Sequence, residues 1–357
     1  MKARLLAAGY FGCGNLGDDA ILLGFTEGLK NEQVELTALS GSPERMMRNV
    51  GVRGIPRRDM KAVAAALEEV DALVFPGGSI FQDVTSVKSV AYYSNLVKMA
   101  KKSGKKVIML GQGVGPLNTL FGKKWAAAAF NAADALVVRD PGSLATLKAI
   151  GVKHIPKVAA DMAFLLPEPE MREQSQNFGV GGMKTVGISI RPWGKDKNRT
   201  VIQEFGELAK LMYQKNYVPV MIGMDAEEDQ PLIDKISAMH GGKVPDLKGL
   251  TNPKQIQERI MRMEAVIAMR LHAGILAATV GVPPFMISYD PKVTAFANSL
   301  GFSTPLTMQG LTAQRIFEGF QNFVQDRDRA AEGLKRKREE LVRQASLNIE
   351  VLRDTLG

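Results

Sequence analysis

The sequence predicts an α/β protein with two domains, each built on a parallel sheet. Runs rich in Val, Ile and Leu alternate with longer helical patterns, and nearly every run ends in glycine, which is typical of βαβ units. The chain has 357 residues, which is longer than chains that usually fold around a single hydrophobic core. With 45% hydrophobic and 23% charged residues, it has the composition of a globular protein. We expect loops at the carboxyl ends of both sheets to face a cleft, where such folds bind ligands.

The expected strands fall into two groups, separated by a segment at 166–183 that is rich in Pro, Gly, Gln and charge and that we interpret as a linker. We therefore expect an N-terminal domain over 1–170, a C-terminal domain over 183–311 and a helical segment over 312–357. The expected strands are 4–8, 34–39, 72–75, 106–110, 135–138 and 157–159, followed by 185–190, 217–222, 265–268 and 284–287.

The end of the chain is predicted to be a charged, amphipathic helix. Leu334, Leu341, Leu347 and Leu352 have a spacing that is compatible with one helical face. We expect this helix to dock onto a domain, and its Arg/Lys cluster leaves contact with an anionic membrane surface as an alternative.

Charge and cysteine content bear on partners and compartment. The net charge of +9 and a pI near 9.5 favour anionic partners. The single cysteine, Cys13, excludes an intramolecular disulfide and a multi-cysteine metal site, which favours a reducing, cytoplasmic location. The N-terminus is typical of a strand and a loop, and no apolar run reaches the roughly 20 residues of a membrane helix. Peripheral contact with the inner membrane face stays open.

The first glycine-rich loop, at 9–20, has the spacing G-x-G-x-x-G between a predicted strand and a helix. A dinucleotide site also needs an acidic residue after the second strand, and 37–41 reads TALSG, which disfavours a nicotinamide cofactor. Small residues at a helix start still let an anion approach backbone N–H groups. Asp18 and Asp19 fall in the first helical turn, where they either cap the helix or orient and deprotonate a sugar hydroxyl.

Two further strands are followed by the glycine-rich segments 75–83 and 111–116. Each glycine alone is most simply a turn former. Three such loops on one sheet edge predict a shelf lined by backbone, from which Gln82, Asp83 and Gln112 can bond a polyhydroxylated ligand.

The sequence VVRDPGS marks another strand end and a strong helix start at Asp140 and Pro141. Arg139 at this point either pairs with Asp140 or faces the cleft.

The second domain places basic residues after its strands. Arg191 follows the strand in SIRPW, and Arg270 and His272 lie between a strand and a helix in AMRLHAG. An arginine fork suits a carboxylate or a phosphate, and a histidine beside it can transfer protons near neutral pH. Lys292 opens a helix in ISYDPKV, where it either binds phosphate or is solvated. We interpret the other two histidines as structural.

The motifs GYFGCGNLGDDAIL, FPGGSIFQDVTS, GQGVGPL, VVRDPGS, SIRPW, AMRLHAG and ISYDPKV occur in this order. Together they resemble the polysaccharide pyruvyl transferase family, most closely its bacterial cell-wall branch, the CsaB type. The resemblance spans about the first 300 residues, and the C-terminal tail carries no family motif.

This resemblance implies two Rossmann-like domains similar to GT-B glycosyltransferases, with phosphoenolpyruvate (PEP) as donor and co-substrate and no cofactor. The family transfers the enolpyruvyl group to a sugar as a cyclic ketal and releases phosphate. In the cell-wall branch the acceptor is N-acetylmannosamine, ketalised at its 4- and 6-hydroxyls, in a lipid-diphosphate-linked disaccharide precursor of the secondary cell wall polysaccharide. The finished polymer anchors S-layer proteins.

By position, Arg191, Arg270, Leu271 and His272 match the PEP-binding residues of the family, and we expect Lys292 to assist them. His272 is the expected general acid, and Arg191 and Arg270 are expected to stabilise the leaving phosphate. Asp18 or Asp19 is the expected base or the group that orients a hydroxyl. No metal site is visible in the sequence. The expected acceptor-binding residues are Gly12, Asn15, Gly78, Gln82, Asp83, Gln112 and Arg139.

Two other functions compete with this interpretation. A GT-B glycosyltransferase that uses a nucleotide sugar is the first, because a fold does not fix a function. The second is a non-catalytic polymer or nucleic-acid binding protein attracted by the positive charge. With 6% aromatic residues the chain lacks the interleaved aromatics of base stacking, so we expect no nucleic-acid partner.

Overall fold

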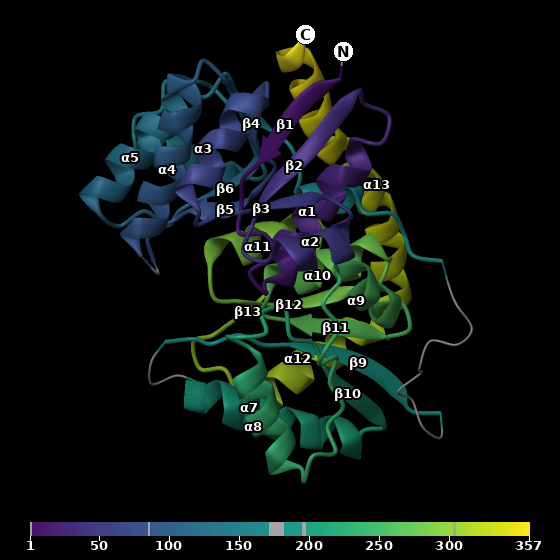
Figure 1. The fold of residues 1–357 in the computed structure, drawn as a ribbon. Coiled ribbons are helices and arrows are strands. Elements are labelled where there is room, and N and C mark those ends of the chain that lie inside the picture. Colours follow the sequence, from purple (N-terminus) through teal and green to yellow (C-terminus); the bar gives the residue numbers. More distant parts are fainter. Residues whose placement is uncertain (1, 85, 171–181, 195–197, 303–304) are drawn as a thin grey trace. The chain divides into compact units, whose positions relative to one another are not determined.

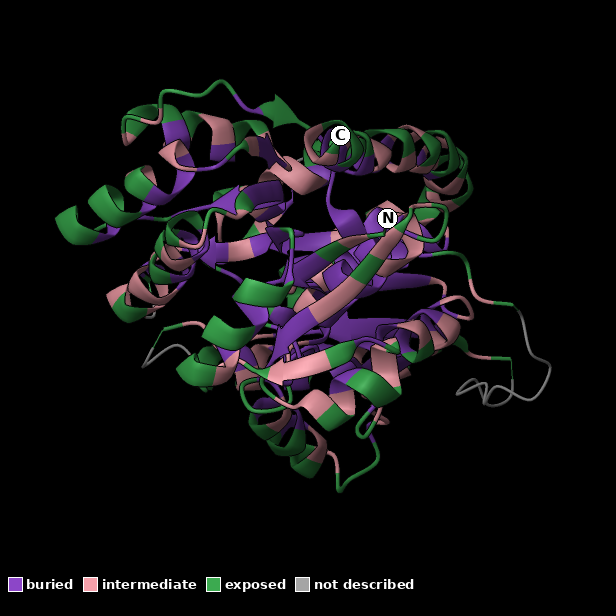
Figure 2. Cartoon of the chain, turned by 45° about the horizontal axis from the view of Figure 1, so that its top comes forward, coloured by how far each residue is buried: buried purple, intermediate pink, exposed green. Residues whose placement is uncertain are grey.

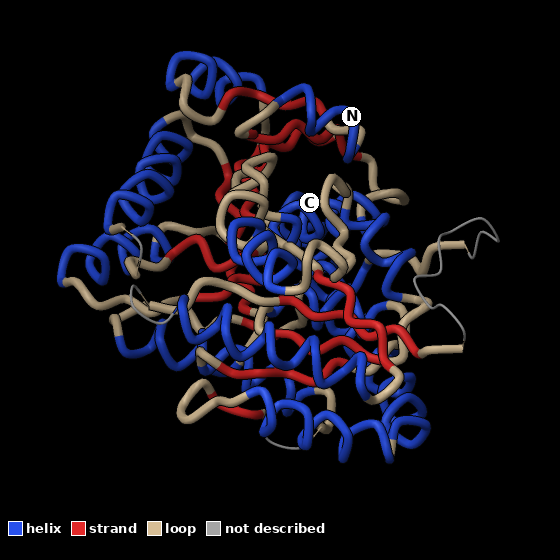
Figure 3. Tube along the Cα trace, turned by 90° about the horizontal axis from the view of Figure 1, so that it is seen from below, coloured by secondary structure: helices blue, strands red, loops and turns tan. Residues whose placement is uncertain are grey.

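A computed structural model of the chain describes residues 2–84, 86–170, 182–194, 198–302 and 305–357. These residues form two compact units (Figure 1). Unit 1 comprises Met1–Leu166 and Leu341–Gly357, and unit 2 comprises Pro167–Glu340. Both are α/β units in which helices flank one parallel sheet, as the tube in Figure 3 traces.

The sheet of unit 1 has the strand order β3-β2-β1-β4-β6-β7-β8, and β5 pairs with β6. Its strands are β1 (Ala3–Ala7), β2 (Val34–Ser40), β3 (Arg53–Pro56), β4 (Ala72–Phe75), β5 (Gly78–Phe81), β6 (Lys106–Val114), β7 (Ala135–Val138) and β8 (Lys157–Val158). Its helices are α1 (Leu16–Gly28), α2 (Pro43–Val50), α3 (Met60–Glu69), α4 (Val87–Lys102), α5 (Leu120–Asn131), α6 (Pro141–Ala149) and a short 3₁₀ helix at Met162–Leu165.

The order of the strands reverses beside β1. The chain runs outward from β1 to β2 and β3, and then returns to place β4 on the other side of β1. Ligands of such sheets bind outside the carboxyl ends of the strands at this switch point. The loops that follow β1 and β4 are therefore the expected ligand-binding loops of unit 1.

The sheet of unit 2 has the order β10-β9-β11-β12-β13, so its own switch point lies between β9 and β11. The strands are β9 (Lys184–Ser189), β10 (Tyr217–Met221), β11 (Ala265–Ala268), β12 (Pro284–Ser288) and β13 (Leu306–Thr307). The helices are α7 (Asn198–Gln214), α8 (Gln230–Met239), α9 (Pro253–Ile260), α10 (Leu271–Thr279), α11 (Pro291–Ser299) and α12 (Ala313–Gln325).

The strands are buried on both faces, which is why they consist of continuous apolar runs. Leu5, Leu6 and Ala7 in β1 are all fully buried, and so are all four residues of β11. Figure 2 shows buried residues along the strands and exposed residues on the outer sides of helices. Burial of this kind is typical of a parallel sheet that is covered by helices on both faces.

Helix α13 (Arg327–Leu356) closes the chain and belongs to both units. In its last part, Ile349 and Leu352 pack into the hydrophobic cluster of unit 1, and the buried Asn348 donates a hydrogen bond to the carbonyl of Ala160. Of the four leucines of the expected face, Leu334, Leu341 and Leu352 are buried and Leu347 is partly buried. The units divide the chain differently from the segments 1–170, 183–311 and 312–357, because the helix end packs against the N-terminal sheet.

Every strand expected from the sequence is present, with small shifts at the ends. Strands β3, β5 and β13 are not among the expected ones, because they are short and the first two contain the glycines and proline that indicate turns. Strand β6 continues past its expected end to Val114, through a register shift between Met109 and Gln112. Of the expected linker at 166–183, residues 171–181 lie outside the described residues.

Within the described ranges, the structure has no helix that is both long enough and apolar enough to cross a membrane.

Candidate functional site

The loop between β1 and α1 is folded tightly around the start of the helix. Asn15 is the N-cap of α1, and its side-chain oxygen accepts hydrogen bonds from the N–H groups of Gly17 and Asp18. Gly12 has a φ of +63°, and a Cβ at this position would lie 2.3 Å from Ser40 Oγ at the end of β2. Only glycine fits here without moving its neighbours. The predicted first-turn position of Asp18 and Asp19 is confirmed.

The structure separates the two aspartates that the sequence left as alternatives. Asp19 is 4% exposed, and its Oδ1 accepts a hydrogen bond of 2.8 Å from the N–H of Gly12. Burial raises the pKa of its carboxyl to about 6, although the Gly12 N–H acts in the opposite direction. Asp18 is only partly buried, and a Cβ on Gly78 would lie 3.1 Å from its Oδ1. Asp18 therefore lies beside the residues that follow β4, at the switch point of the sheet.

The segment after β4 is not the loop that the sequence predicts, because residues from Gly78 onward form β5. Gly77 and Gly78 have φ values of +145° and +92°, and they turn the chain from β4 into this strand. Gln82 follows β5, and its Oε1 accepts a hydrogen bond from the N–H of Val84.

Asp83 has a structural set of partners. Its two oxygens accept hydrogen bonds from the N–H of Asn118 at 2.7 Å, and from the N–H and the hydroxyl of Thr119 at 2.8 and 2.6 Å. Burial acts to raise the pKa of the Asp83 carboxyl, but the three hydrogen-bond donors act in the opposite direction and have the larger effect. The pKa therefore lies below its usual value. Asp83 thus links the end of β5 to the N-cap of α5 by hydrogen bonds.

Gln112 was expected on a glycine-rich shelf, and the structure corrects this placement. The residue lies inside β6 and is fully buried, with Nε2 donating hydrogen bonds of 2.9 Å to the carbonyls of Phe75 and Leu110. The glycines around it belong to a bulged strand and not to a loop, which is why its side chain turns inward. We therefore leave Gln112 out of the acceptor site.

Arg139 is also held inside unit 1. Its side chain is 6% exposed, and Nη1 lies 2.6 Å from Asp161 while Nη2 donates to the hydroxyl of Ser79 at 2.7 Å. Asp140, the partner that the sequence suggests, lies 3.8 Å from Nε and caps α6. Arg139 links three segments of the sheet edge, and we do not assign it to the acceptor.

One basic residue beside the first glycine-rich loop was not predicted. Arg57 follows β3, and its guanidinium donates hydrogen bonds to Cys13 Sγ at 3.4 Å and to the hydroxyl of Tyr93 at 3.0 Å. It also lies 5.0 Å from the ring centre of Tyr10 and 5.1 Å from that of Tyr92. Arg57 therefore fastens the loop to α4. No motif surrounds it in the sequence, so only the fold reveals this role.

In unit 2, Arg191 and Arg270 follow β9 and β11, the two strands that flank the switch point. The guanidinium of Arg191 stacks 4.3 Å from the centre of the Tyr289 ring, and its Nε donates to the carbonyl of Pro192. Tyr289 follows β12, so three neighbouring strands contribute to this arrangement. The sequence predicts the arginines here and gives no signal for the tyrosine beneath one of them.

Arg270 forms an ion pair with two carboxylates from the loop before α8. Its Nε lies 3.1 Å from both oxygens of Asp229, and its Nη2 bonds both Asp229 and Glu228. Burial lowers the pKa of the guanidinium, but the two carboxylates raise it by more. Burial raises the pKa of Asp229, opposed by Arg270 and by the N–H groups of Asp225 and Met224. These partners were missed, because an acidic run such as DAEED is typical of a solvated turn.

The residues after Arg270 open α10. Arg270 is at the N-cap position, so Leu271 and His272 belong to the first turn, where backbone N–H groups lack partners within the helix. Leu271 is 7% exposed and His272 is partly buried. Lys292 lies in the first turn of α11, and its Nζ is 3.7 Å from Asp290. The structure thus brings the predicted basic residues to one sheet edge, beside two helix N-termini that favour anions.

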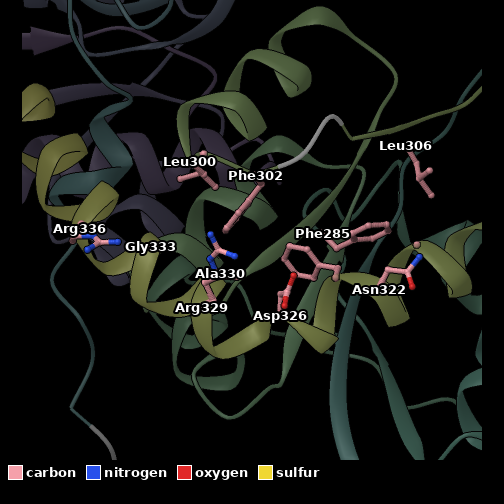
Figure 4. A pocket seen from close by; sticks show the side chains of 13 residues that line it. Phe285, Leu300, Phe302, Leu306, Asn322, Asp326, Arg329, Ala330, Gly333 and Arg336 are labelled. Carbon is pink, nitrogen blue, oxygen red and sulfur yellow. The ribbon is translucent and has the colours of Figure 1, made fainter.

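Unit 2 also has a cavity of about 630 Å³ that is lined by Phe285, Phe323 and Arg329 among others (Figure 4). Phe285 lies near the start of β12, whereas the predicted PEP-binding residues lie beyond the strand ends. None of those predicted residues lines this cavity. Over the described ranges, no three His, Cys, Asp or Glu side chains are grouped so that they could hold a metal ion.

A sequence model of the family described as polysaccharide pyruvyl transferase matches residues 15–291. The amylovoran biosynthesis protein AmsJ of Erwinia amylovora is 25% identical over 366 aligned positions, gaps included, and the match covers 84% of this chain and 86% of AmsJ. The chain also resembles solved structures. Anabaena HepE in complex with UDP-glucose has a TM-score of 0.60 and 9% identity, over 99% of this chain and 98% of HepE. UDP-GlcNAc 2-epimerase of Neisseria meningitidis, bound to UDP-GlcNAc, has a TM-score of 0.61 and 12% identity, over 98% and 100%.

The structural similarity confirms the fold class, two Rossmann-like α/β units of the GT-B type. It does not identify the chemistry, because the sequence identities are low. The family match covers most of the chain, and it includes the loops after β9 and β11 and the start of α11. The chain therefore belongs to the polysaccharide pyruvyl transferase family and is a transferase.

Proposed function

We propose that this transferase moves the enolpyruvyl group of PEP onto two hydroxyls of a sugar, forms a cyclic ketal and releases inorganic phosphate. The observation that carries the proposal is the position of Arg191 and Arg270 at the switch point of the unit 2 sheet. PEP has a carboxylate and a phosphate, and each of them suits a planar arginine fork. Unit 2 is thus the proposed PEP-binding unit.

The start of α10 supports an anion at the same place. The N-terminal turn of a helix carries a partial positive charge and unsatisfied N–H groups, and here it contains Leu271 and His272. Lys292 adds a point charge from the start of α11. A phosphate held by these groups would be stabilised as it leaves, because the positive charges are fixed before the reaction begins.

The chemistry requires one proton donor and two proton acceptors. His272, as the imidazolium, donates a proton to the methylene carbon of PEP, which becomes the pyruvyl methyl group and leaves an oxocarbenium-like carbon. A sugar hydroxyl attacks this carbon and loses its proton. The second hydroxyl then displaces phosphate, and its proton leaves to a base or to the phosphate. The products are the ketal and inorganic phosphate.

For the acceptor we propose unit 1, with Asp18 as the base or the group that orients a hydroxyl. Asp19 is less suited because it is buried and bonded to the Gly12 N–H. Asp18 lies near Gly78, and both flank the switch point of the sheet. Gly12, Asn15 and Gln82 complete the proposed acceptor side, whereas Asp83, Gln112 and Arg139 have structural roles.

The acceptor that we propose is N-acetylmannosamine, ketalised at its 4- and 6-hydroxyls, in a lipid-diphosphate-linked precursor of the secondary cell wall polysaccharide. This assignment rests on the ordered motifs that resemble the CsaB type. AmsJ is by its name a protein of amylovoran biosynthesis, which supports a polysaccharide product more generally. The pyruvylated polymer would anchor S-layer proteins, and a lipid-linked acceptor would bring the enzyme to the inner membrane face.

The test measures phosphate release from PEP with and without a synthetic N-acetylmannosaminyl-N-acetylglucosamine diphosphate lipid analogue, together with the mass of the acceptor. We expect phosphate release that depends on the acceptor, and an acceptor that gains one pyruvyl ketal. If PEP stabilises the protein against heat but no turnover occurs, the result would support PEP as the donor and would mean that the acceptor is a different sugar. Stabilisation by a nucleotide sugar, with none by PEP, would support a glycosyltransferase instead.

A further inference from the structure

The hydrogen bonds of Arg270 leave only one edge of its guanidinium for a ligand. The group has five N–H donors, one on Nε and two on each Nη. Asp229 accepts from Nε and Nη2, and so occupies the side edge of the fork. Glu228 Oε2 accepts the other N–H of Nη2 at 2.8 Å. The remaining edge of the guanidinium, at the end of the side chain, presents one N–H of Nη1 and one N–H of Nη2. A carboxylate or phosphate that binds this edge with two hydrogen bonds needs the N–H of Nη2 that Glu228 occupies.

The two carboxylates are held very differently. The side chain of Asp229 is fully buried and also accepts hydrogen bonds from the N–H groups of Met224 and Asp225, so that it is part of the fold. The side chain of Glu228 is 48% exposed. Its backbone is fixed separately, because its N–H donates to Asp225 Oδ1. The Glu228 carboxylate can therefore rotate into water while the loop stays in place.

From this geometry we propose that Glu228 is an exchangeable internal anion, which competes with PEP for the outer N–H of Arg270 Nη2 and thereby sets the affinity for PEP. The inference rests on the proposed function of Arg270 in binding PEP. The Glu228 side chain of this ion pair is half exposed, whereas that of Arg270 is 12% exposed. Water reaches the Glu228 carboxylate and screens the pair, and the glutamate side chain loses rotamer freedom when it pairs, so Glu228 is held weakly. The ligand, with more than one negative charge and a bidentate geometry, displaces it. Asp229 remains as the residue that positions the fork.

The experiment compares Glu228→Gln with Glu227→Gln. Glu227 is the adjacent residue, is exposed, and makes no bond to Arg270, so both variants remove the same charge from the same loop. We expect Glu228→Gln to lower the KM for PEP by about 2- to 5-fold, the range of an ion pair that water screens, with kcat unchanged. Glu227→Gln should keep the wild-type KM when measured at about 0.3 M salt, where long-range charge effects are screened.

Each other outcome overturns the inference. An unchanged KM in Glu228→Gln would mean that Glu228 does not compete, and a raised KM would mean that it helps to bind PEP. Equal decreases in both variants would assign the effect to net charge. Calorimetric titration of the wild type and both variants with inorganic phosphate makes the same comparison in the absence of a reaction. We expect Glu228→Gln to bind phosphate more tightly than the wild type, and Glu227→Gln to bind it as the wild type does. A wild-type enzyme that does not turn over PEP would overturn the proposed function, while the phosphate titration would still decide whether Glu228 competes for Arg270.

Discussion

Arg270 and Asp229 form a buried ion pair at the carboxyl end of β11, with Arg270 Nε 3.1 Å from both oxygens of a fully buried carboxylate. The same carboxylate accepts two backbone N–H groups from the loop that follows β10. The pair therefore connects the loops of two different strands, and it fixes the orientation of the arginine that we assign to PEP. Its energetic value and its chemical role can be separated by experiment.

Asp229→Asn should destabilise unit 2. The substitution leaves the largely buried guanidinium of Arg270 without its main counter-ion, and removal of one partner of a buried pair costs about 3 kcal/mol. We expect the variant to unfold at a lower urea concentration than the wild type, with unfolding monitored by circular dichroism. The matched control is Asp234→Asn in α8, which breaks a half-exposed ion pair with Lys248 and should change stability by about 0.5 kcal/mol or less. Equal losses in both variants would contradict the structural role of Asp229.

His272→Ala should lose turnover while it keeps PEP binding. If His272 donates the proton to PEP, its removal lowers kcat by about 100-fold or more, with a small change in the dissociation constant of PEP. Arg270→Ala should instead weaken PEP binding directly, because it removes the fork that holds the anion. Phosphate release gives kcat, and calorimetry gives the dissociation constant. Normal turnover by His272→Ala would show that another group is the proton donor.

The alternation of apolar runs and helices was enough to predict the α/β class, because strands buried on both faces leave a continuous apolar run in the sequence. The positions of Arg191, Arg270 and His272 at strand ends and helix starts were predictable for the same reason. The short strand β5 was not, because the glycines of Gly78–Phe81 indicate a turn when they are considered without the neighbouring β6.

Partners across the fold could not be predicted. Glu228 and Asp229 are adjacent in an acidic run, and nothing local distinguishes the exposed carboxylate from the buried one. The burial of Gln112 depends on a bulge in β6, and that of Arg139 on the distant Asp161. Such contacts join residues that are far apart in the sequence, so a local pattern carries no trace of them.

Arg191→Lys should impair PEP binding even though the substitution keeps the positive charge. The flat guanidinium of Arg191 stacks on the ring of Tyr289, and an ammonium group has neither this planar contact nor a bidentate fork. We expect the KM for PEP to rise by about 10-fold, with a smaller change in kcat. Tyr289→Leu keeps the arginine and removes the ring face, so it should raise KM by a smaller factor. A wild-type KM in Arg191→Lys would exclude a bidentate contact.

The buried carboxyl of Asp19 predicts how the stability of unit 1 depends on pH. Burial raises its pKa from 3.8 to about 6, so the folded protein binds this proton more tightly than the unfolded chain does. The stability due to this group is therefore fully present below about pH 3.8 and is lost as the pH rises to about 6. At pH 7.5 the ionised, buried carboxylate costs on the order of 1–3 kcal/mol.

Asp19→Asn tests this cost, because the side-chain oxygen of asparagine can still accept the hydrogen bond from the Gly12 N–H. We expect the variant to unfold at a higher temperature than the wild type at pH 7.5, and at about the same temperature at pH 3.5. At pH 3.5 the Asp19 carboxyl of the wild type is protonated in the folded protein and mostly protonated in the unfolded chain, so it is nearly as uncharged as the asparagine amide. The comparison of one variant at two pH values is its own control. A gain in stability that is equal at both values would contradict the raised pKa and would point to a change in packing around Gly12 instead.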